Sequence, residues 1–185
     1  MKSEREKMVA GEIYNPTDPE LVRARHRAHS LCQRLNTTTE DEITVRRQIY
    51  LDLFASGGDT VWVEPPFYCD YGDNITLGEG VFFNFDCVIL DVAPVTVGDR
   101  TMFGPAVQIY AASHPMDWRL RAEDREFGKP VTIGSNVWVG GAVVFSPGVT
   151  VGDRTVIGAG SVVTRDIPDD VFAAGNPCCV IRTLE

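Results

Sequence analysis

The sequence lacks an excess of basic residues, a long apolar run and an apolar N-terminal leader. Its 185 residues carry a formal net charge of −9, which disfavours nonspecific nucleic-acid binding because such binding requires a basic face. No segment approaches the roughly 18 consecutive apolar residues of a membrane-spanning helix. The first residues, Met-Lys-Ser-Glu-Arg-Glu-Lys, contain no signal-peptide core. We therefore expect neither nucleic acid nor a membrane as a partner.

Cysteine and histidine are few and poorly spaced for metal chemistry. The five cysteines are odd in number and form no Cys-x-x-Cys motif, which favours reduced thiols in a cytoplasmic protein over a disulfide framework. His26 and His29 lie three residues apart on an expected helix. They could form a metal pair, but two surface histidines are the favoured interpretation. No metal requirement is expected.

The sequence does contain a six-residue repeat, unbroken from Ile133 to Pro168. Each unit opens with an apolar residue and carries a small or apolar residue four places later. The opening residues are Ile133, Val139, Phe145, Val151, Ile157 and Val163, and the later ones are Val137, Val143, Val149, Thr155, Ser161 and Ile167. A period of six fits neither a helix nor simple strand alternation. It does fit three-sided coils stacked into a parallel β-helix, with strands about 4.8 Å apart and like residues in interior columns.

The earlier chain shows the same pattern less regularly. Leu77 and Val97 open units twenty residues apart, two more than a whole coil, so we expect a bulge near Val92–Pro94. Cys69 and Cys87 are eighteen residues apart, and this spacing predicts that they stack in one interior column.

A polar stretch interrupts the repeat over residues 113–130, and the pattern then returns in phase, since 97 to 133 is thirty-six residues. The stretch is either an ordered excursion from one coil or a floppy insert. Its Trp, Met and Phe side chains favour docking against the protein.

Residues 1–57 predict an N-terminal helical arm, and residues 58–185 the β-helix domain. Three capping boxes mark expected helix starts: Ser3 with Glu6, Thr17 with Glu20, and Thr39 with Glu42. Apolar stripes follow, at Leu21, Ala24, Ala28, Leu31 and Leu35, and then at Ile43, Ile49 and Leu53. We expect a helical hairpin packed beside the β-helix.

His114 is the histidine that lies within the repeat region, at the start of the excursion in Tyr110-Ala-Ala-Ser-His-Pro-Met-Asp117. Histidine is suited to accept a proton near neutral pH. Pro115 restricts His114 to extended backbone conformations. A packed or turn histidine is the alternative, and this segment taken alone favours it.

Other blocks are more specific. They are Phe83-Asn-Phe-Asp-Cys-Val-Ile-Leu-Asp91, Gly128-Lys-Pro-Val-Thr-Ile-Gly134, Asn136-Val-Trp-Val-Gly-Gly141 and Ala174-Gly-Asn-Pro177. Together with Lys7-Met-x-x-Gly-Glu-x-Tyr14, Glu64-Pro-Pro-Phe-x-Cys-Asp-Tyr-Gly72 and the His114 segment, they span nearly the whole chain. In these blocks the chain resembles the hexapeptide-repeat sugar O-acetyltransferases, above all the maltose O-acetyltransferases, with galactoside and nodulation acetyltransferases next.

The resemblance implies a mainly β fold, a left-handed parallel β-helix of hexapeptide repeats that assembles as a homotrimer with active sites between subunits. It also implies acetyl transfer from acetyl-CoA to a sugar hydroxyl, of the maltose or glucose type. His114 would act as the catalytic general base, so that the acceptor attacks the thioester directly. Cys87 lies near the site in sequence, but a buried thiol is a poor nucleophile.

Three residues match acceptor-binding positions of the family. Asn84 would bind the sugar, because an amide offers both donors and acceptors, although an Asn ladder or a turn within the coil is the alternative. Asp70 would contact a sugar diol, and Asp91 would touch the acceptor or orient the histidine. Tyr68 and Phe82 depart from the residues that relatives carry, which leaves the preferred sugar open.

Six residues match cofactor-binding positions for acetyl-CoA: Trp138, Gly141, Ala159, Thr164, Arg165 and Arg182. Gly141 would let the pantetheine approach the backbone, although the need for glycine at a tight coil corner explains this residue equally well. Arg182 would grip a phosphate. Cys179 stands where relatives can carry another arginine, which would weaken the nucleotide end.

Three alternatives stay open. A zinc hydratase on this fold needs three histidine ligands, and the repeat region offers His114 alone. A catalytically inactive repeat scaffold is disfavoured by the intact His114 and Asn84. An acetyltransferase with a non-sugar acceptor, such as an antibiotic hydroxyl or serine, keeps the same chemistry.

Overall fold

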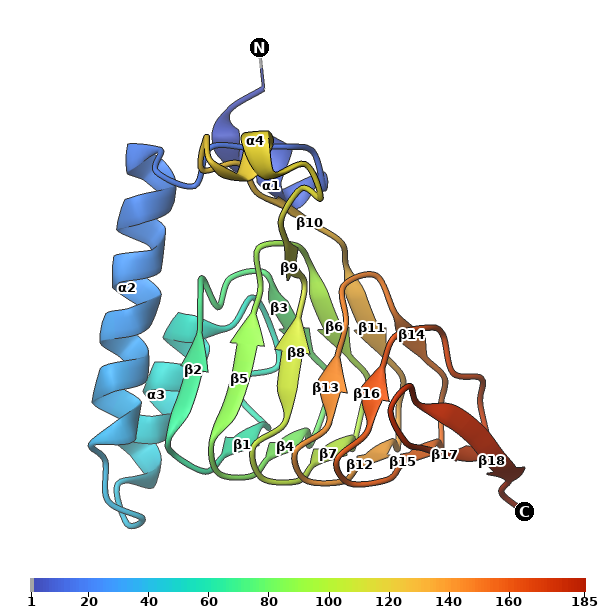
Figure 1. Cartoon of the computed structure of the whole chain (residues 1–185). Helices are drawn as coiled ribbons and strands as arrows, with labels where there is room; N and C mark the ends of the chain where they lie inside the picture. Colours follow the sequence, from blue (N-terminus) through green and yellow to red (C-terminus); the bar gives the residue numbers. More distant parts are fainter. Residues whose placement is uncertain (1) are drawn as a thin grey trace.

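The computed structural model describes residues 2–185, in which helices at the N-terminal end precede a long parallel β-helix (Figure 1). The helices are α1 (Glu4–Val9), α2 (Pro19–Asn36), α3 (Ile43–Leu53) and the short α4 (Trp118–Arg121). Within residues 2–185, no helix is both long enough and apolar enough to span a bilayer.

Three parallel sheets form the three sides of the β-helix, named here in the order in which a coil meets them. Side 1 is seven-stranded: β1 (Trp62–Val63), β4 (Phe82–Phe83), β7 (Met102–Phe103), β12 (Trp138–Val139), β15 (Val156–Ile157), β17 (Val171–Ala174) and the antiparallel β18 (Cys179–Thr183). Side 2 is five-stranded: β2 (Phe67–Cys69), β5 (Cys87–Leu90), β8 (Gln108–Tyr110), β13 (Val144–Phe145) and β16 (Val162–Val163). Side 3 is four-stranded: β3 (Ile75–Leu77), β6 (Val95–Val97), β11 (Val131–Ile133) and β14 (Thr150–Val151).

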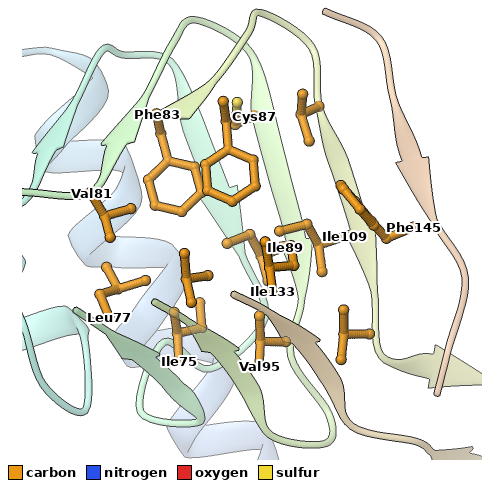
Figure 2. Close-up of a cluster of buried hydrophobic side chains, with 14 of the residues drawn as sticks. Ile75, Leu77, Val81, Phe83, Cys87, Ile89, Val95, Ile109, Ile133 and Phe145 are labelled. Carbon is orange, nitrogen blue, oxygen red and sulfur yellow. The ribbon is translucent and has the colours of Figure 1, made fainter. Parts of the chain in front are cut away.

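The interior columns predicted from the hexads are confirmed. All twelve predicted inward residues between Ile133 and Ile167 are at most 3% exposed. Side chains from all three sides meet in this interior (Figure 2), where the Phe83 and Phe103 rings stack with centroids 4.5 Å apart. Aliphatic and aromatic columns therefore hold successive coils in register.

The early coils are longer than the later ones. Ile75 pairs with Val95 and Phe67 with Cys87, a step of twenty residues, whereas Thr132 pairs with Thr150, a step of eighteen. Val95–Val97 directly follows the Asp91–Pro94 corner, so the bulge expected near Val92–Pro94 is confirmed. The predicted stacking of Cys69 on Cys87 is wrong, because Cys69 aligns with Ile89.

The excursion over 113–130 leaves from the same corner, between sides 2 and 3, and returns in phase, since Val97 pairs with Ile133. It is ordered: β9 (Ala112–Ser113) pairs antiparallel with β10 (Phe127–Gly128), with α4 between them. Gly128 sits so tightly that a Cβ there would lie 2.8 Å from the Ala93 side chain. The apolar residues of the excursion were expected to dock against the protein. Phe127 does so and is partly buried, but Met116 and Trp118 are 94% and 63% exposed.

The arm covers the first coil rather than forming a separate core. Leu31 and Leu35 of α2, Ile49 of α3 and the interior of the β-helix belong to one buried cluster, and Figure 1 shows α2 and α3 against the end formed by β1 and β2. The expected helical hairpin is therefore confirmed, and it closes an end of the β-helix that would otherwise be open.

Of the three predicted capping boxes, the structure contains one complete box, at Ser3 and Glu6. The Thr17 box is wrong: α2 is capped by Asp18, whose side chain accepts from the Glu20 N–H, because Pro19 fixes the first helical position. At Thr39, Glu42 accepts from the Thr39 N–H, but Glu42 itself precedes α3 without a side-chain cap.

Candidate active site

His114 lies at the corner where the excursion leaves side 2, in a cavity of about 520 Å³. The wall includes Asp70 and Tyr71 from the β-helix, Arg25 and His29 from α2, and Arg121, Asp124 and Glu126 from the excursion. The His114 side chain is 58% exposed. It therefore lines a cavity and is not packed in the protein interior, which was one of the two alternatives.

Neighbouring groups orient the imidazole. Nδ1 lies 3.4 Å from the carbonyl oxygen of Arg125. Because a carbonyl only accepts, the tautomer with the proton on Nδ1 satisfies this contact and leaves the lone pair on Nε2. Arg121 donates to the carbonyls of Pro115 and Met116 at 2.8 Å, which fixes the segment after His114.

Glu126 stands beside the imidazole and is itself held by the arm. Its Oε1 lies 4.0 Å from His114 Nε2, and its Oε2 accepts a 2.6 Å hydrogen bond from the hydroxyl of the fully buried Tyr14. The two backbones also form a β-bridge, with Tyr14 N–H donating to Glu126 O at 3.0 Å. Burial and this carboxylate raise the pKa of Tyr14 well above its usual range, so Tyr14 stays a hydrogen-bond donor.

Asp70 lies in the wall of the cavity that contains His114. Burial raises the pKa of its carboxyl, while nearby His29 and Arg25 oppose that effect. His29 and Asp70 also line a second cavity of about 520 Å³, together with Tyr68, Val88 and Leu90. The two cavities therefore meet along α2.

The prediction that Asp91 touches the acceptor or His114 is wrong. Asp91 is 0% exposed, and its carboxylate accepts from the backbone N–H groups of Asp70, Tyr71 and Gly72 at 2.7 to 3.0 Å. Burial raises its pKa to about 7. Asp91 thus holds the corner that positions Asp70, and its effect on the site is indirect.

Asn84 does not lie beside His114 in this chain. It follows β4 at the corner between sides 1 and 2 and lines a cavity of about 550 Å³ with Trp138, Gly141 and Ala159. Its Oδ1 accepts from the Phe85 N–H at 2.8 Å, which leaves the Nδ2 donors for a ligand. Three predicted cofactor residues and one predicted acceptor residue therefore share one cavity.

The glycines of this cavity have a packing role. A Cβ at Gly140 would lie 2.5 Å from Ala159 N of the next coil, and one at Gly141 would lie 3.1 Å from Pro105 O. The close approach of neighbouring coils requires glycine at position 140. The backbone at this position has no side chain and lines the cavity.

The remaining predicted cofactor residues lie toward the C-terminal end. Arg182 shares a cavity of about 280 Å³ with Trp138 and Phe172. Thr164 and Arg165 are exposed just after β16, and neither is among the residues that line these four cavities.

Sequence reasoning missed several wall residues of the His114 cavity. His29 was interpreted as a surface histidine, and Arg25 and Glu126 carried no motif signal. Tyr14 was part of a matched block, but its contact with Glu126 spans 112 positions of the chain, which no local pattern reveals.

Two other chemistries find no support in this arrangement. Cys87 is 1% exposed, and burial raises the pKa of its thiol to about 11, so it is not an activated nucleophile. No group of three histidine, cysteine or carboxylate side chains within residues 2–185 is arranged to hold a metal ion.

Comparisons with known proteins agree with this arrangement. Residues 7–58 match the maltose acetyltransferase hexapeptide capping motif, and residues 130–165 match the bacterial transferase hexapeptide family with its six repeats. Nodulation protein L of Rhizobium meliloti is 46% identical over 97% of this chain and 98% of its own length.

Solved structures extend the likeness to the whole fold. A maltose O-acetyltransferase from Clostridium difficile 630 superposes with a TM-score of 0.98 at 49% identity, over 100% of this chain and 98% of the other. A galactoside acetyltransferase in complex with coenzyme A gives 0.93 at 40% identity, over 100% and 92%. The fold is thus the expected left-handed β-helix, and the chain belongs to the hexapeptide-repeat acetyltransferases of the maltose and galactoside O-acetyltransferase family.

Proposed function

We propose that the protein transfers acetyl from acetyl-CoA to a hydroxyl of a sugar of the maltose or glucose type, with His114 as general base. The observation that carries this proposal is His114 itself, exposed in a cavity with its Nδ1 held by the Arg125 carbonyl. The free lone pair of Nε2 is therefore available to a hydroxyl in the cavity.

The chemistry requires one base and no covalent enzyme intermediate. Nε2 of His114 takes the proton of the acceptor hydroxyl while the oxygen attacks the thioester carbonyl. The tetrahedral intermediate collapses with cleavage of the C–S bond, and the departing thiolate takes the proton from the imidazolium. General-base catalysis of this kind contributes about 10²–10⁴-fold.

Glu126 has a supporting role in this mechanism. Its carboxylate lies 4.0 Å from Nε2, where it can pair with the imidazolium that forms when the acceptor loses its proton. Tyr14 holds that carboxylate from the arm. Asp70, in the same wall, accepts hydrogen bonds from further hydroxyls of a sugar.

The acetyl donor fits the cavity at the corner between sides 1 and 2. It is lined by Trp138, Gly141 and Ala159 along the axis of the β-helix, a form that suits an extended pantetheine arm beside bare backbone. Arg182 lies farther along, where a guanidinium can bind phosphate oxygens. A galactoside acetyltransferase of the same fold was solved with coenzyme A, which supports a CoA thioester as the acetyl donor.

A complete site needs two copies of the chain. His114 and the donor cavity lie at opposite edges of side 2, and a side of about six residues measures roughly 15–20 Å. The reacting atoms must come within about 3–3.5 Å. We therefore propose a homotrimer in which the His114 corner of one subunit meets the Asn84 corner of the next, so that both residues contact one acceptor.

The test is turnover of acetyl-CoA by purified protein, followed as thiol release, with maltose, glucose, galactosides, chloramphenicol or serine as acceptor. Acetylation of maltose or glucose in preference to the others is expected. His114→Ala is the matched control and should lower kcat by about a hundredfold or more, with assembly and acetyl-CoA affinity retained. Turnover of the His114→Ala variant at the wild-type rate would remove His114 as the base.

Two outcomes of the same assay separate the alternatives. Preference for chloramphenicol or serine would replace the sugar with another acceptor, and no turnover with any acceptor would favour an inactive scaffold. A cytoplasmic location is part of the proposal, because all five cysteines are free thiols.

A further inference from the structure

Cys32 and Cys69 face each other where α2 lies on β2, with their Sγ atoms 3.7 Å apart. They come from different elements and are separated by 37 positions in the chain. The other thiols have other neighbours: Cys87 donates to Gly104 O and Cys179 to Pro177 O, and Cys178 lies buried at the far end of the β-helix.

The elements that carry the two thiols are fixed against each other. Asn36, one turn after Cys32 on α2, donates from Nδ2 to Phe67 O at 3.1 Å and accepts at Oδ1 from Phe67 N–H at 2.8 Å. Phe67 begins the strand that Cys69 ends. This two-bond clamp prevents α2 from sliding along β2, so the contact between the two sulfur atoms is built into the packing.

The pair borders a cavity. Cys32 and Cys69 are 2% and 3% exposed, yet both line the cavity of about 520 Å³ that also contains Tyr68, His29 and Asp70. Because His29 and Asp70 also line the His114 cavity, the thiols lie next to the proposed acceptor site.

We propose that Cys32 and Cys69 form an oxidisable thiol pair, which hydrogen peroxide converts into a disulfide that ties α2 to β2 beside the acceptor cavity. The sulfur of Cys32 attacks one peroxide oxygen, the O–O bond breaks, and a sulfenic acid and one water form. The Cys69 thiol then displaces the hydroxyl as a second water and forms the S–S bond. Two thiols are oxidised and one peroxide is reduced to two waters.

The environment of the pair supports this order of events. The hydrogen bond between the thiols lowers the pKa of Cys32, and the same bond together with burial raises that of Cys69. Cys32 is therefore the thiol that reaches the reactive thiolate form first.

Oxidation changes the geometry of the wall. The sulfur atoms must close from 3.7 Å to a bond of about 2.05 Å, and Asp70 directly follows Cys69. Resting on the proposed function, the disulfide should displace Asp70 and raise the KM for the acceptor by about tenfold, while the KM for acetyl-CoA stays unchanged.

The experiment treats the native protein with hydrogen peroxide, blocks remaining thiols with iodoacetamide, and identifies linked peptides by mass spectrometry before and after dithiothreitol. The expected result is a reducible link between the Cys32 and Cys69 peptides, in wild type and in Cys179→Ser. Cys32→Ser and Cys69→Ser should each abolish it. Thermal unfolding shows whether each variant is folded. If Cys32→Ser does not fold, Cys32→Ala replaces it.

Failure of the link to form in folded wild-type protein, while the exposed Cys179 is oxidised, would overturn the proposal. The covalent result does not depend on enzymatic activity, so it stands apart from the proposed function. If the link forms and the acceptor KM is unchanged, the pair is oxidisable but does not control acceptor binding, and that part of the proposal is wrong.

Discussion

A mixture of two impaired variants should recover activity if the site lies between subunits. His114 and Asn84 lie at opposite edges of side 2, in cavities that share no lining residue. A site that uses both residues therefore takes one from each of two neighbouring copies. His114→Ala and Asn84→Ala each remove one half of every site in a homotrimer.

The magnitude follows from counting. In trimers assembled at random from equal amounts of the two variants, a site is intact when its first subunit retains His114 and its second retains Asn84. Each condition has a chance of one half, so about a quarter of the sites are complete in a closed ring of identical interfaces. Either variant alone has none.

The assay is thiol release from acetyl-CoA with the preferred sugar, after the two variants are unfolded together and refolded, or co-expressed with different tags. With the acceptor well below its KM, the expected rate is about a quarter of the wild-type rate, against about a tenth for Asn84→Ala alone and about a hundredth or less for His114→Ala alone. Mixing after separate folding is the control and should restore nothing until subunits exchange. A co-refolded mixture no more active than its components would refute a shared site.

Three further predictions concern single residues. Asn84→Ala should raise the acceptor KM by about tenfold, because one hydrogen bond to a bound hydroxyl is lost; unchanged KM and kcat would count against the assignment. Tyr14→Phe should lower kcat by about tenfold with the acetyl-CoA KM unchanged, since Glu126 loses its 2.6 Å hydrogen bond; an unaltered kcat would show that Glu126 needs no support from the arm. Asp91→Asn should flatten the dependence of stability on pH, as measured by urea unfolding at about pH 5 and about pH 8.

The sign of the Asp91 effect follows from its environment. Burial raises its pKa to about 7 from an ordinary value of 3.8, so the folded chain keeps a proton that the unfolded chain has lost. Its contribution to stability is present below about pH 4 and is lost as pH rises toward 7, by up to about 4 kcal/mol. A wild-type protein with the same slope as Asp91→Asn would contradict this reasoning.

The sequence predicted the β-helix well because its repeat is local. A residue every six positions must reach the same column if coils have three equal sides, so Ile133 to Val163 fall into the core without reference to the rest of the chain. The same phase located the excursion at 113–130. The six-residue period gave a wrong prediction for Cys69 and Cys87, because the corners of the early coils are two residues longer than those of the later coils and shift the columns.

The candidate site was predicted unevenly. The structure brings His114 and Asp70 together in one cavity and Trp138, Gly141 and Ala159 together in another, and their roles stay predictions. Asp91 was misassigned because a carboxylate beside a site looks the same in sequence whether it binds a ligand or three backbone N–H groups.

By itself, the sequence determined the period, the interior columns, the helical arm and the position of His114, because these depend on residues close together in the chain. The tertiary structure alone decided that Tyr14 and Glu126 lie beside His114, that Cys32 meets Cys69, and that Asn84 lies a full side away. The first two depend on how the arm packs against the excursion and against β2, and the third depends on which corner the excursion leaves. Packing between distant segments is set by shape and burial rather than by spacing.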